Sequence, residues 1–149
     1  MKIDVLVLGK MKDFAKIAEE YIKMLSQFIE VRLLELGHEN LDDESCLKRD
    51  ATRVLRILKD DDHLILLDEH GKDFDSISFA HHIFELMKRK GKLVFLVGGP
   101  LGVDDSLKKR ANEKISLSRM TLPHRIATIV LLEQLFRSFK ILSNQKYHY

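Results

Sequence analysis

The sequence is poor in the features that define several protein classes. Its 149 residues include one cysteine, Cys46, which excludes an internal disulfide framework and which we interpret as a helix-surface or half-buried thiol. There is no apolar run of transmembrane length and no recognisable secretory signal. The net charge is only +2, which allows a nucleic-acid partner without demanding one. We therefore expect a cytoplasmic protein with no membrane association.

Motifs for common ligands are missing as well. The glycine-rich stretch 98–102 does not match the dinucleotide pattern G-x-G-x-x-G and lacks the Lys-Ser/Thr pair of a phosphate-binding loop. A dinucleotide or a triphosphate is therefore a disfavoured ligand. His81 and His82 are adjacent and would point apart on a helix, and no Cys/His/Asp cluster has ligand spacing, so we expect no metal.

Strand and helix patterns alternate along the chain. Runs rich in Val and Leu predict strands, and apolar residues spaced by three or four predict helices. The expected strands cover 2–8, 31–36, 63–67, 93–97 and 115–117, and the expected helices cover 14–28, 44–58, 76–89, 104–112 and 123–142. Ser76 is expected to cap its helix, and 37–43 is expected to be a polar loop. The alternation predicts a single α/β domain over residues 1–149, with a parallel-rich sheet covered on both faces.

Three of the expected strands are followed by loops that contain glycine, serine or threonine. In open α/β sheets, ligands bind beyond the carboxyl ends of the strands. We therefore predict a ligand pocket built from these three loops, with backbone hydrogen bonds to a nucleoside-like ligand. Its apolar walls would come from Leu67, Leu117, Met120 and Leu122. The alternative is that the loops are ordinary turns and that Ser118 and Thr121 only cap the helix beginning at Pro123.

Other residues have both a structural and a functional interpretation. The last helix is apolar on more than one side, which predicts either a central core helix or contact with a second subunit. The basic run 108–110 with Lys114 is either a solvated face or a phosphate-binding surface. Glu133 and Arg137 have the spacing of a helical ion pair. Among the histidines, we expect His38 and His63 at the surface, His70 in the pocket loop and His124 in a structural role.

Several motifs together carry a family resemblance. They are Lys2-Ile-Asp-Val-Leu-Val-Leu-Gly-Lys10, Leu67-Asp-Glu-His-Gly-Lys72, Val97-Gly-Gly-Pro-Leu-Gly102, Ser116-Leu-Ser-Arg-Met-Thr-Leu-Pro-His124, Glu133-Gln-Leu-Phe-Arg137 and Tyr147-His148. In this order the chain resembles the RlmH-type pseudouridine N-methyltransferases of the bacterial large ribosomal subunit, within the SPOUT superfamily. It departs at the tail, where Asn144-Gln-Lys-Tyr-His-Tyr149 stands in place of Gly-x-Pro-Tyr-His and a basic residue.

The resemblance implies a fold, a cofactor and a partner. The fold would be a SPOUT domain with a deep trefoil knot in its carboxyl-terminal part, assembled as a homodimer. The cofactor would be S-adenosylmethionine, and the partner ribosomal RNA or the ribosome. In the pocket predicted above, the cofactor-binding residues would be Leu67, Gly98, Gly102, Leu117, Ser118, Arg119, Met120, Thr121 and Leu122.

The implied reaction is methylation of a pseudouridine ring nitrogen, N-3, in 23S ribosomal RNA, with the assembled ribosome as substrate. The resemblance sets the Tyr-His pair of the tail beside the target nucleoside. Tyr147 would stack on the base, and His148 would hydrogen-bond it or accept its proton as the candidate catalytic residue. The alternative function is a non-enzymatic ribosome-binding or assembly factor with a nucleoside pocket.

Overall fold

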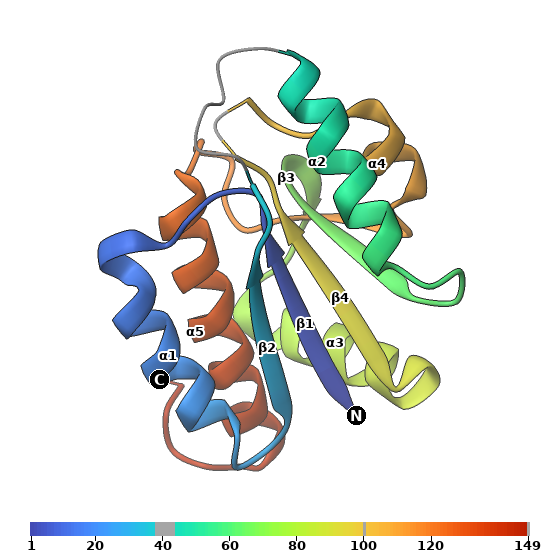
Figure 1. The fold of residues 1–149 in the computed structure, drawn as a ribbon. Coiled ribbons are helices and arrows are strands. Elements are labelled where there is room, and N and C mark those ends of the chain that lie inside the picture. The colour runs from blue at the N-terminus through green and yellow to red at the C-terminus, as the bar shows by residue number, and fades with distance from the viewer. Residues whose placement is uncertain (38–43, 100, 149) are drawn as a thin grey trace.

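The computed structural model describes residues 1–37, 44–99 and 101–148 of the 149-residue chain. The chain forms a five-stranded sheet with helices on both faces (Figure 1). The strands are β1 (Lys2–Val7), β2 (Glu30–Glu35), β3 (His63–Asp73), β4 (Lys92–Val97) and β5 (Glu113–Ser116). The helices are α1 (Ala15–Leu25), α2 (Glu44–Ile57), α3 (Ser76–Lys90), α4 (Asp105–Arg110) and α5 (His124–Leu142), with a 3-10 turn η1 (Lys12–Phe14) before α1. His38 and the rest of the expected loop after Gly37 lie outside the described residues.

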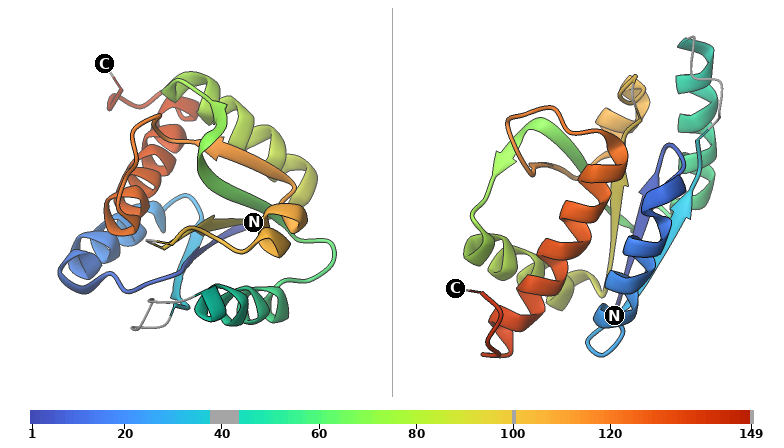
Figure 2. Two further views of the ribbon diagram at one scale, coloured as in Figure 1. Left: turned by 90° about the horizontal axis from the view of Figure 1, so that it is seen from above. Right: turned by 90° about the vertical axis from the view of Figure 1, so that its left-hand side faces the viewer.

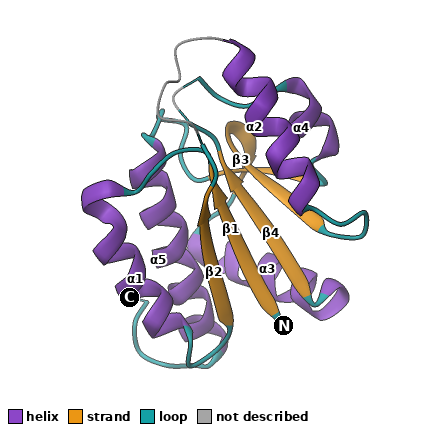
Figure 3. Ribbon diagram, viewed as in Figure 1, coloured by secondary structure: helices purple, strands orange, loops and turns teal. Residues whose placement is uncertain are grey.

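All strand pairs are parallel, and the strand order is β2-β1-β4-β3-β5. The prediction of an α/β fold with a helix-covered parallel sheet is therefore confirmed. The carboxyl ends of parallel strands lie at the same end of their sheet. Because β4, β3 and β5 are neighbours, the loops that follow them meet at one end of the sheet (Figure 3).

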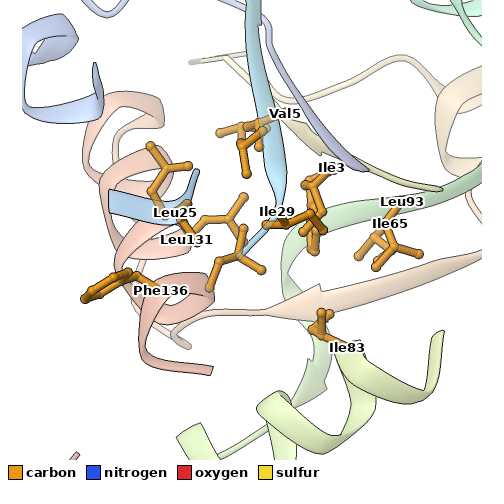
Figure 4. Close-up of a cluster of buried hydrophobic side chains, with 14 of the residues drawn as sticks. Ile3, Val5, Leu25, Ile29, Ile65, Ile83, Leu93, Leu131 and Phe136 are labelled. Atoms are coloured by element: carbon orange, nitrogen blue, oxygen red, sulfur yellow. The ribbon is translucent and has the colours of Figure 1, made fainter. Parts of the chain in front are cut away.

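Each face of the sheet buries its own set of side chains, since successive strand residues point to opposite faces. In β1, Ile3 and Val5 belong to the large cluster formed with α1, α3 and α5 (Figure 4). Leu6 belongs to a smaller cluster on the other face, which joins the sheet to Val54 of α2 and Leu107 of α4. The fold is thus a three-layer sandwich with α1, α5 and α3 on one side and α2 and α4 on the other (Figure 2).

The last helix, α5, lies between α1 and α3 and packs against both, as well as against the sheet (Figure 2). Ala127, Leu131, Leu132 and Leu135 are buried in these contacts. The helix is therefore buried on more than one side, as predicted, and most of this burial comes from contacts within the same chain. Ile126, near its amino end, remains 38% exposed.

Strand β3 extends to Asp73, although the sequence pattern predicted its end at Leu67. Ile115 of β5 aligns with Leu67 in one section of the ladder and with Lys72 in the next, so the intervening residues form a bulge. A Cβ atom on Gly71 would lie 2.7 Å from the backbone carbon of Lys114, so the two strands approach closely there. The polar bulge interrupts the apolar pattern, which explains the early predicted end.

Two predicted helix caps are wrong. Asp75, not Ser76, caps α3: its Oδ1 accepts from the Ser78 N–H at 2.7 Å, and the Ser78 hydroxyl accepts from the Asp75 N–H at 3.1 Å. Helix α5 begins at His124 with Pro123 at the N-cap and without a side-chain cap, so Ser118 and Thr121 do not cap it. The sequence pattern located both helices but could not say which polar neighbour faces the free N–H groups.

Two surface assignments also change. Cys46 is only 4% exposed and is therefore buried, with its Sγ 3.4 Å from Arg49 Nη2. His63 is not a surface residue, since its side chain is 11% exposed and its Nε2 lies 3.2 Å from Glu113 Oε2. Glu113, at the start of β5, also contacts His82 of α3, with 2.6 Å between Oε1 and Nε2. One carboxylate therefore contacts both His63 and His82.

Asp4 is a buried carboxylate in the middle of the sheet. Arg32 of β2 donates from Nε and Nη2 to its two oxygens at 3.0 and 2.9 Å, and Lys92 Nζ lies 3.5 Å from Oδ2. Burial acts to raise the pKa of Asp4, but the hydrogen bonds and charges of Arg32 and Lys92 together outweigh it. The pKa of Asp4 is therefore held below its ordinary value.

We predict that Asp4→Asn lowers the free energy of unfolding at neutral pH by roughly 1–3 kcal/mol, because charge-assisted hydrogen bonds to Arg32 are lost. A depressed folded-state pKa stabilises the fold above the unfolded-state pKa of about 3.9, and this stabilisation disappears as pH falls through the folded pKa. Urea unfolding should therefore show a difference between wild type and variant that shrinks below about pH 4. The exposed Asp61→Asn serves as the control and should change little. A difference that stays constant through this acid range contradicts the prediction.

Candidate functional site

A cavity of about 310 Å³ opens where the ends of β3, β4 and β5 meet. Its volume lies within the range of small-ligand pockets, roughly 300–1,000 Å³. The predicted site residues that line it are Leu67, Gly98, Gly102, Leu117, Ser118, Met120, Thr121 and Leu122. The structure thus brings together three loops that are far apart in the sequence, at the place where the pocket was predicted.

Arg119 is the predicted cofactor-binding residue that does not line this cavity. Its side chain is 85% exposed, and its guanidinium pairs with Asp73 at 3.0 Å between Nη2 and Oδ2. This ion pair ties the loop after β5 to the end of β3. Its neighbours Ser118 and Met120 turn toward the cavity instead.

The floor of the cavity is a tight glycine turn after β4. The Gly102 N–H donates to the Gly99 carbonyl at 2.9 Å, and Gly102 has a positive φ of 80°. Side chains rarely adopt this backbone conformation, so glycine suits the turn. The absence of side chains at Gly98, Gly99 and Gly102 leaves backbone groups at the cavity surface, as a ligand bound through main-chain hydrogen bonds requires.

The hydroxyl groups of the third loop hold the loops together. The Thr121 hydroxyl donates to Glu69 Oε2 at 2.6 Å and thereby links the loop before α5 to the bulge of β3. The Ser118 hydroxyl accepts from the Met120 N–H at 2.9 Å, and the Ser116 hydroxyl donates to the Ser118 carbonyl at 2.9 Å. These bonds fix the shape of the cavity wall.

The cavity has charged residues that the sequence prediction did not assign to it. Asp68 and Glu69 lie along one wall and Lys108 along another, with Val103 and Ala127 as further apolar lining. Asp68 and Glu69 follow Leu67 directly, so a position next to a predicted pocket residue was the available signal. Ala127 lies one turn into α5, and only the fold brings it to the cavity. Carboxylates at the wall favour a ligand that carries positive charge.

The amino end of α5 is anchored to the loop after β1. The Lys10 carbonyl accepts from Arg125 Nε at 2.8 Å and lies 3.1 Å from His124 Nε2. Because a carbonyl oxygen only accepts, this nitrogen of His124 must carry a proton when it bonds. The contact agrees with the structural role predicted for His124. His70, in contrast, is a solvated residue with an 85% exposed side chain, 3.4 Å from Glu69.

The carboxyl-terminal tail folds back onto α5. The ring of Tyr147 packs edge-on against Phe136 with 5.0 Å between centroids, and the Arg137 guanidinium lies 4.7 Å from its centroid. The Tyr147 hydroxyl donates to Glu133 Oε1 at 3.3 Å. Burial first, and the charge of Glu133 second, raise the pKa of Tyr147, so this hydroxyl keeps its proton. Tyr147 and His148 thus both contact residues of α5.

Glu133, Arg137 and His148 form one group. Arg137 donates from Nε and Nη2 to Glu133 Oε1 at 3.0 and 2.6 Å, which confirms the predicted ion pair. Its Nη1 lies 3.1 Å from Nδ1 of the exposed His148. The hydrogen bond to Glu133 raises the pKa of Arg137 despite partial burial. An arginine cation only donates, so it stabilises the form of His148 in which Nδ1 is unprotonated.

A second cavity, of about 320 Å³, lies between the start of α3, the end of β5 and α5. Leu117 lines both cavities, so the second begins where the first ends. Asp75 lines it too, and His148 is close enough to contribute to the low pKa of Asp75, whose main cause is hydrogen bonding from Ser78. The tail is thus near the second cavity, whereas neither Tyr147 nor His148 lines the first.

Among the described residues, no group of three or more His, Cys, Asp or Glu side chains is placed to hold a metal ion. In the same part of the chain, no helix is long and apolar enough to cross a membrane.

In α/β proteins a pocket beyond the ends of parallel strands is the usual place for a small ligand, and this chain has both the sheet and the pocket. Comparison with known families specifies the class, because residues 1–148 match the family described as "Predicted SPOUT methyltransferase". The chain belongs to this family and is therefore an enzyme of the methyltransferase type. The resemblance noted in the sequence is confirmed.

Individual relatives match over their full length. A protein of Pseudothermotoga lettingae is 51% identical, with 100% of both chains covered, and one of Thermosipho melanesiensis is 40% identical, also with 100% of both covered. A protein of Ruminiclostridium cellulolyticum is 35% identical over 99% of both chains. Each of these relatives is named ribosomal RNA large subunit methyltransferase H.

We predict that Gly98→Val weakens binding of a methyl donor, measured with S-adenosylmethionine, by about tenfold or more, since a branched side chain would enter a cavity sized for a small ligand. A Cβ atom at Gly98 would lie 3.1 Å from Val103 Cγ1, so that side chain must also shift by a few tenths of an ångström. Gly98→Ala adds only this Cβ atom and is the graded control, with a smaller effect. Calorimetry measures binding, and thermal unfolding checks that both variants stay folded. Wild-type affinity in a folded Gly98→Val protein would show that the pocket is misassigned.

Proposed function

We propose that the protein uses S-adenosylmethionine to methylate N-3 of a pseudouridine in 23S ribosomal RNA, with the assembled ribosome as substrate. The observation that carries this proposal is the end-to-end match to relatives named ribosomal RNA large subunit methyltransferase H. The cavity formed by three strand-end loops gives such a reaction a cofactor site. The rival function, a ribosome-binding factor without catalysis, is disfavoured by membership of a methyltransferase family.

The first cavity suits S-adenosylmethionine chemically. Leu67, Leu117 and Leu122 would flank the adenine, while the glycine turn would bond polar groups of the ligand through its backbone. Asp68 and Glu69 would face the positive charges of the sulfonium and amino groups. When bound, the cofactor would supply a methyl group on a sulfonium, a carbon already activated for displacement.

The protein's own residues would bind and orient the two reactants and would accept one proton. The ring nitrogen must lose its proton as its electron pair forms the new bond to the methyl carbon. His148 is our candidate acceptor. Arg137 donates to its Nδ1 here, so a neutral ring carries its proton on Nε2, and Nδ1 would have to turn from Arg137 to the nucleoside to accept the proton of the ring nitrogen. Tyr147 would pack against the target nucleoside or hold His148 in place. Holding the reactants in line can lower the barrier by roughly 7–11 kcal/mol in favourable cases.

We also propose a homodimer in which the tail of one subunit serves the cavity of the other. His148 does not line the first cavity of its own chain, and apolar surface is exposed at Met120, which lines that cavity, and at Ile126, next to the lining residue Ala127. Two subunits would also offer RNA more surface than one small domain. Since a ribosomal substrate is found in the cytoplasm, we assign the protein to that compartment.

The carboxyl-terminal part would carry the deep trefoil knot of the SPOUT fold. Support comes from the path of the chain, which leaves β5 at the edge of the sheet and returns to place α5 between α1 and α3. Such a path crosses the ends of strands that precede β5 in the sequence. The cofactor cavity would then be formed by the loops of the knot.

We predict that wild-type protein incorporates labelled methyl groups from S-adenosylmethionine into assembled ribosomes, with isolated subunits and free 23S RNA as comparison substrates. His148→Gln should lower this rate by about 100-fold, the usual size of a general-base contribution, while cofactor affinity stays unchanged. His81→Gln, an exposed histidine of α3, is the control and should retain full activity.

The outcomes separate the proposals. Incorporation into none of the three substrates by the wild type would leave the rival binding factor as the better function. Full activity of His148→Gln would remove His148 as the proton acceptor and leave the reaction itself in place.

We predict that the protein sediments as a dimer at micromolar concentration and that Ile126→Asp shifts it toward monomer, because a charge would replace exposed apolar surface. Ile57→Asp is the matched control, since Ile57 is 39% exposed on α2, on the other face of the sheet. A monomeric wild type in sedimentation velocity would rule out the homodimer.

A further inference from the structure

The outward side of α2 is basic along its whole length. Lys48, Arg49, Arg53 and Arg56 are all exposed. Arg49, Arg53 and Arg56 have the spacing i, i+4 and i+7, which places them in one stripe about 10 Å long. The opposite side of the helix contains Ala51 and Val54 and is buried against the sheet.

Acidic groups near these residues are few. Helix α2 contains Glu44 at its first position and Asp50, which is 1% exposed, and the charge of Lys48 contributes to the low pKa of Asp104, whose main cause is hydrogen bonding from Ser106. Among the described residues, no acidic group lies within ion-pair distance of Arg53 or Arg56. Arg49 Nη2 has neutral partners at the edge of hydrogen-bond range, Ser45 Oγ at 3.3 Å and Cys46 Sγ at 3.4 Å.

The positive surface continues onto α4, which lies beside α2 on the same face of the sheet (Figure 1). Lys108 and Lys109 are exposed there, and Lys108 also lines the first cavity. Asp105 offsets part of this charge, at 4.0 Å from Lys108 Nζ. We call the six residues Lys48, Arg49, Arg53, Arg56, Lys108 and Lys109 the basic face.

Arg110 does not belong to the basic face, although it completes the basic run in the sequence. Its Nη2 donates to the carbonyls of Lys59 and Asp62 at 3.0 and 2.8 Å, and its Nη1 donates to Asn112 Oδ1 at 3.0 Å. Arg110 thus closes the loop before β3 and contributes to the fold. The basic run therefore divides into a structural arginine and two lysines available to a partner.

We propose that the basic face docks the phosphate backbone of ribosomal RNA beside the target nucleotide; this inference rests on the proposed function. Arginine binds phosphate oxygens through its fixed fork of donors, and a row of such groups follows a sugar–phosphate chain without reading its sequence. Lys108 connects the row to the cofactor cavity, so RNA held on α2 and α4 reaches the mouth of the site. An anionic membrane or an acidic protein would need no such continuity with the cavity.

The test compares two double variants of equal charge. Arg53→Gln with Arg56→Gln removes two charges from the basic face, and Arg89→Gln with Lys90→Gln removes two exposed charges from the end of α3 on the opposite face. For the first variant we expect KM for ribosomes to rise roughly tenfold with kcat and cofactor affinity unchanged. The slope of log affinity against log salt, measured by co-pelleting with ribosomes, should fall by roughly 1.5, as for two lost phosphate contacts. The second variant should behave as wild type.

Equal KM and equal salt slopes in wild type and the Arg53/Arg56 variant would overturn the proposal. Loss of binding to phosphatidylserine vesicles or to an acidic peptide, with ribosome binding intact, would overturn it as well. Because co-pelleting does not require methyl transfer, docking is tested even if the wild type shows no activity. Failure of the proposed function and failure of this inference are therefore distinguishable.

Discussion

The close approach of backbone segments around Leu8 and Gly9 is the constraint on which the rest of the site depends. A Cβ atom on Gly37 would lie 2.5 Å from the Gly9 nitrogen, and one on Gly99 would lie 2.5 Å from the Leu8 carbonyl oxygen. A Cβ atom on Gly9 itself would meet His124 Nε2 at 2.6 Å. The chain after β1, β2 and β4 and the amino end of α5 can therefore meet only where side chains are missing. This contact sets the position of the glycine turn under the cavity and the starting point of α5.

From that starting point, α5 connects the first cavity with the carboxyl-terminal tail. Its amino end helps close the first cavity through Ala127, and its middle part supports the tail through Phe136 and Arg137. Helix and tail are held by packing against the large core cluster, with Tyr147 as a partly buried residue against it. Because α5 lies between α1 and α3, it fixes the position of the tail relative to the first cavity. The opposite face of the sheet is covered by α2 and α4, which carry the exposed residues of the basic face.

Much of the fold was predictable because hydrophobic periodicity is local. All five strands and all five helices were expected from the pattern, with boundaries that differ by a few residues at most except at β3. There, the bulge between Leu67 and Lys72 is stabilised by pairing with β5, a partner 40 or more residues later in the chain. No local pattern contains that information. The caps of α3 and α5 were wrong for a related reason, since several polar residues stand near each helix start and the backbone path decides among them.

By itself, the sequence determined the α/β class, the strand-end loops and the motifs that identify the family, because each depends on residue types at fixed spacing. Tertiary structure decided which of those residues act together. In the sequence, Arg119 and Arg110 have the character of ligand-binding residues. In the structure, Arg119 forms an ion pair with Asp73, and Arg110 donates hydrogen bonds to two backbone carbonyls, so both stabilise the fold. Asp68, Glu69 and Ala127 enter the cavity wall only because β3, β5 and α5 converge there. Such contacts join residues far apart in the chain, and their energies depend on distances that exist only after folding.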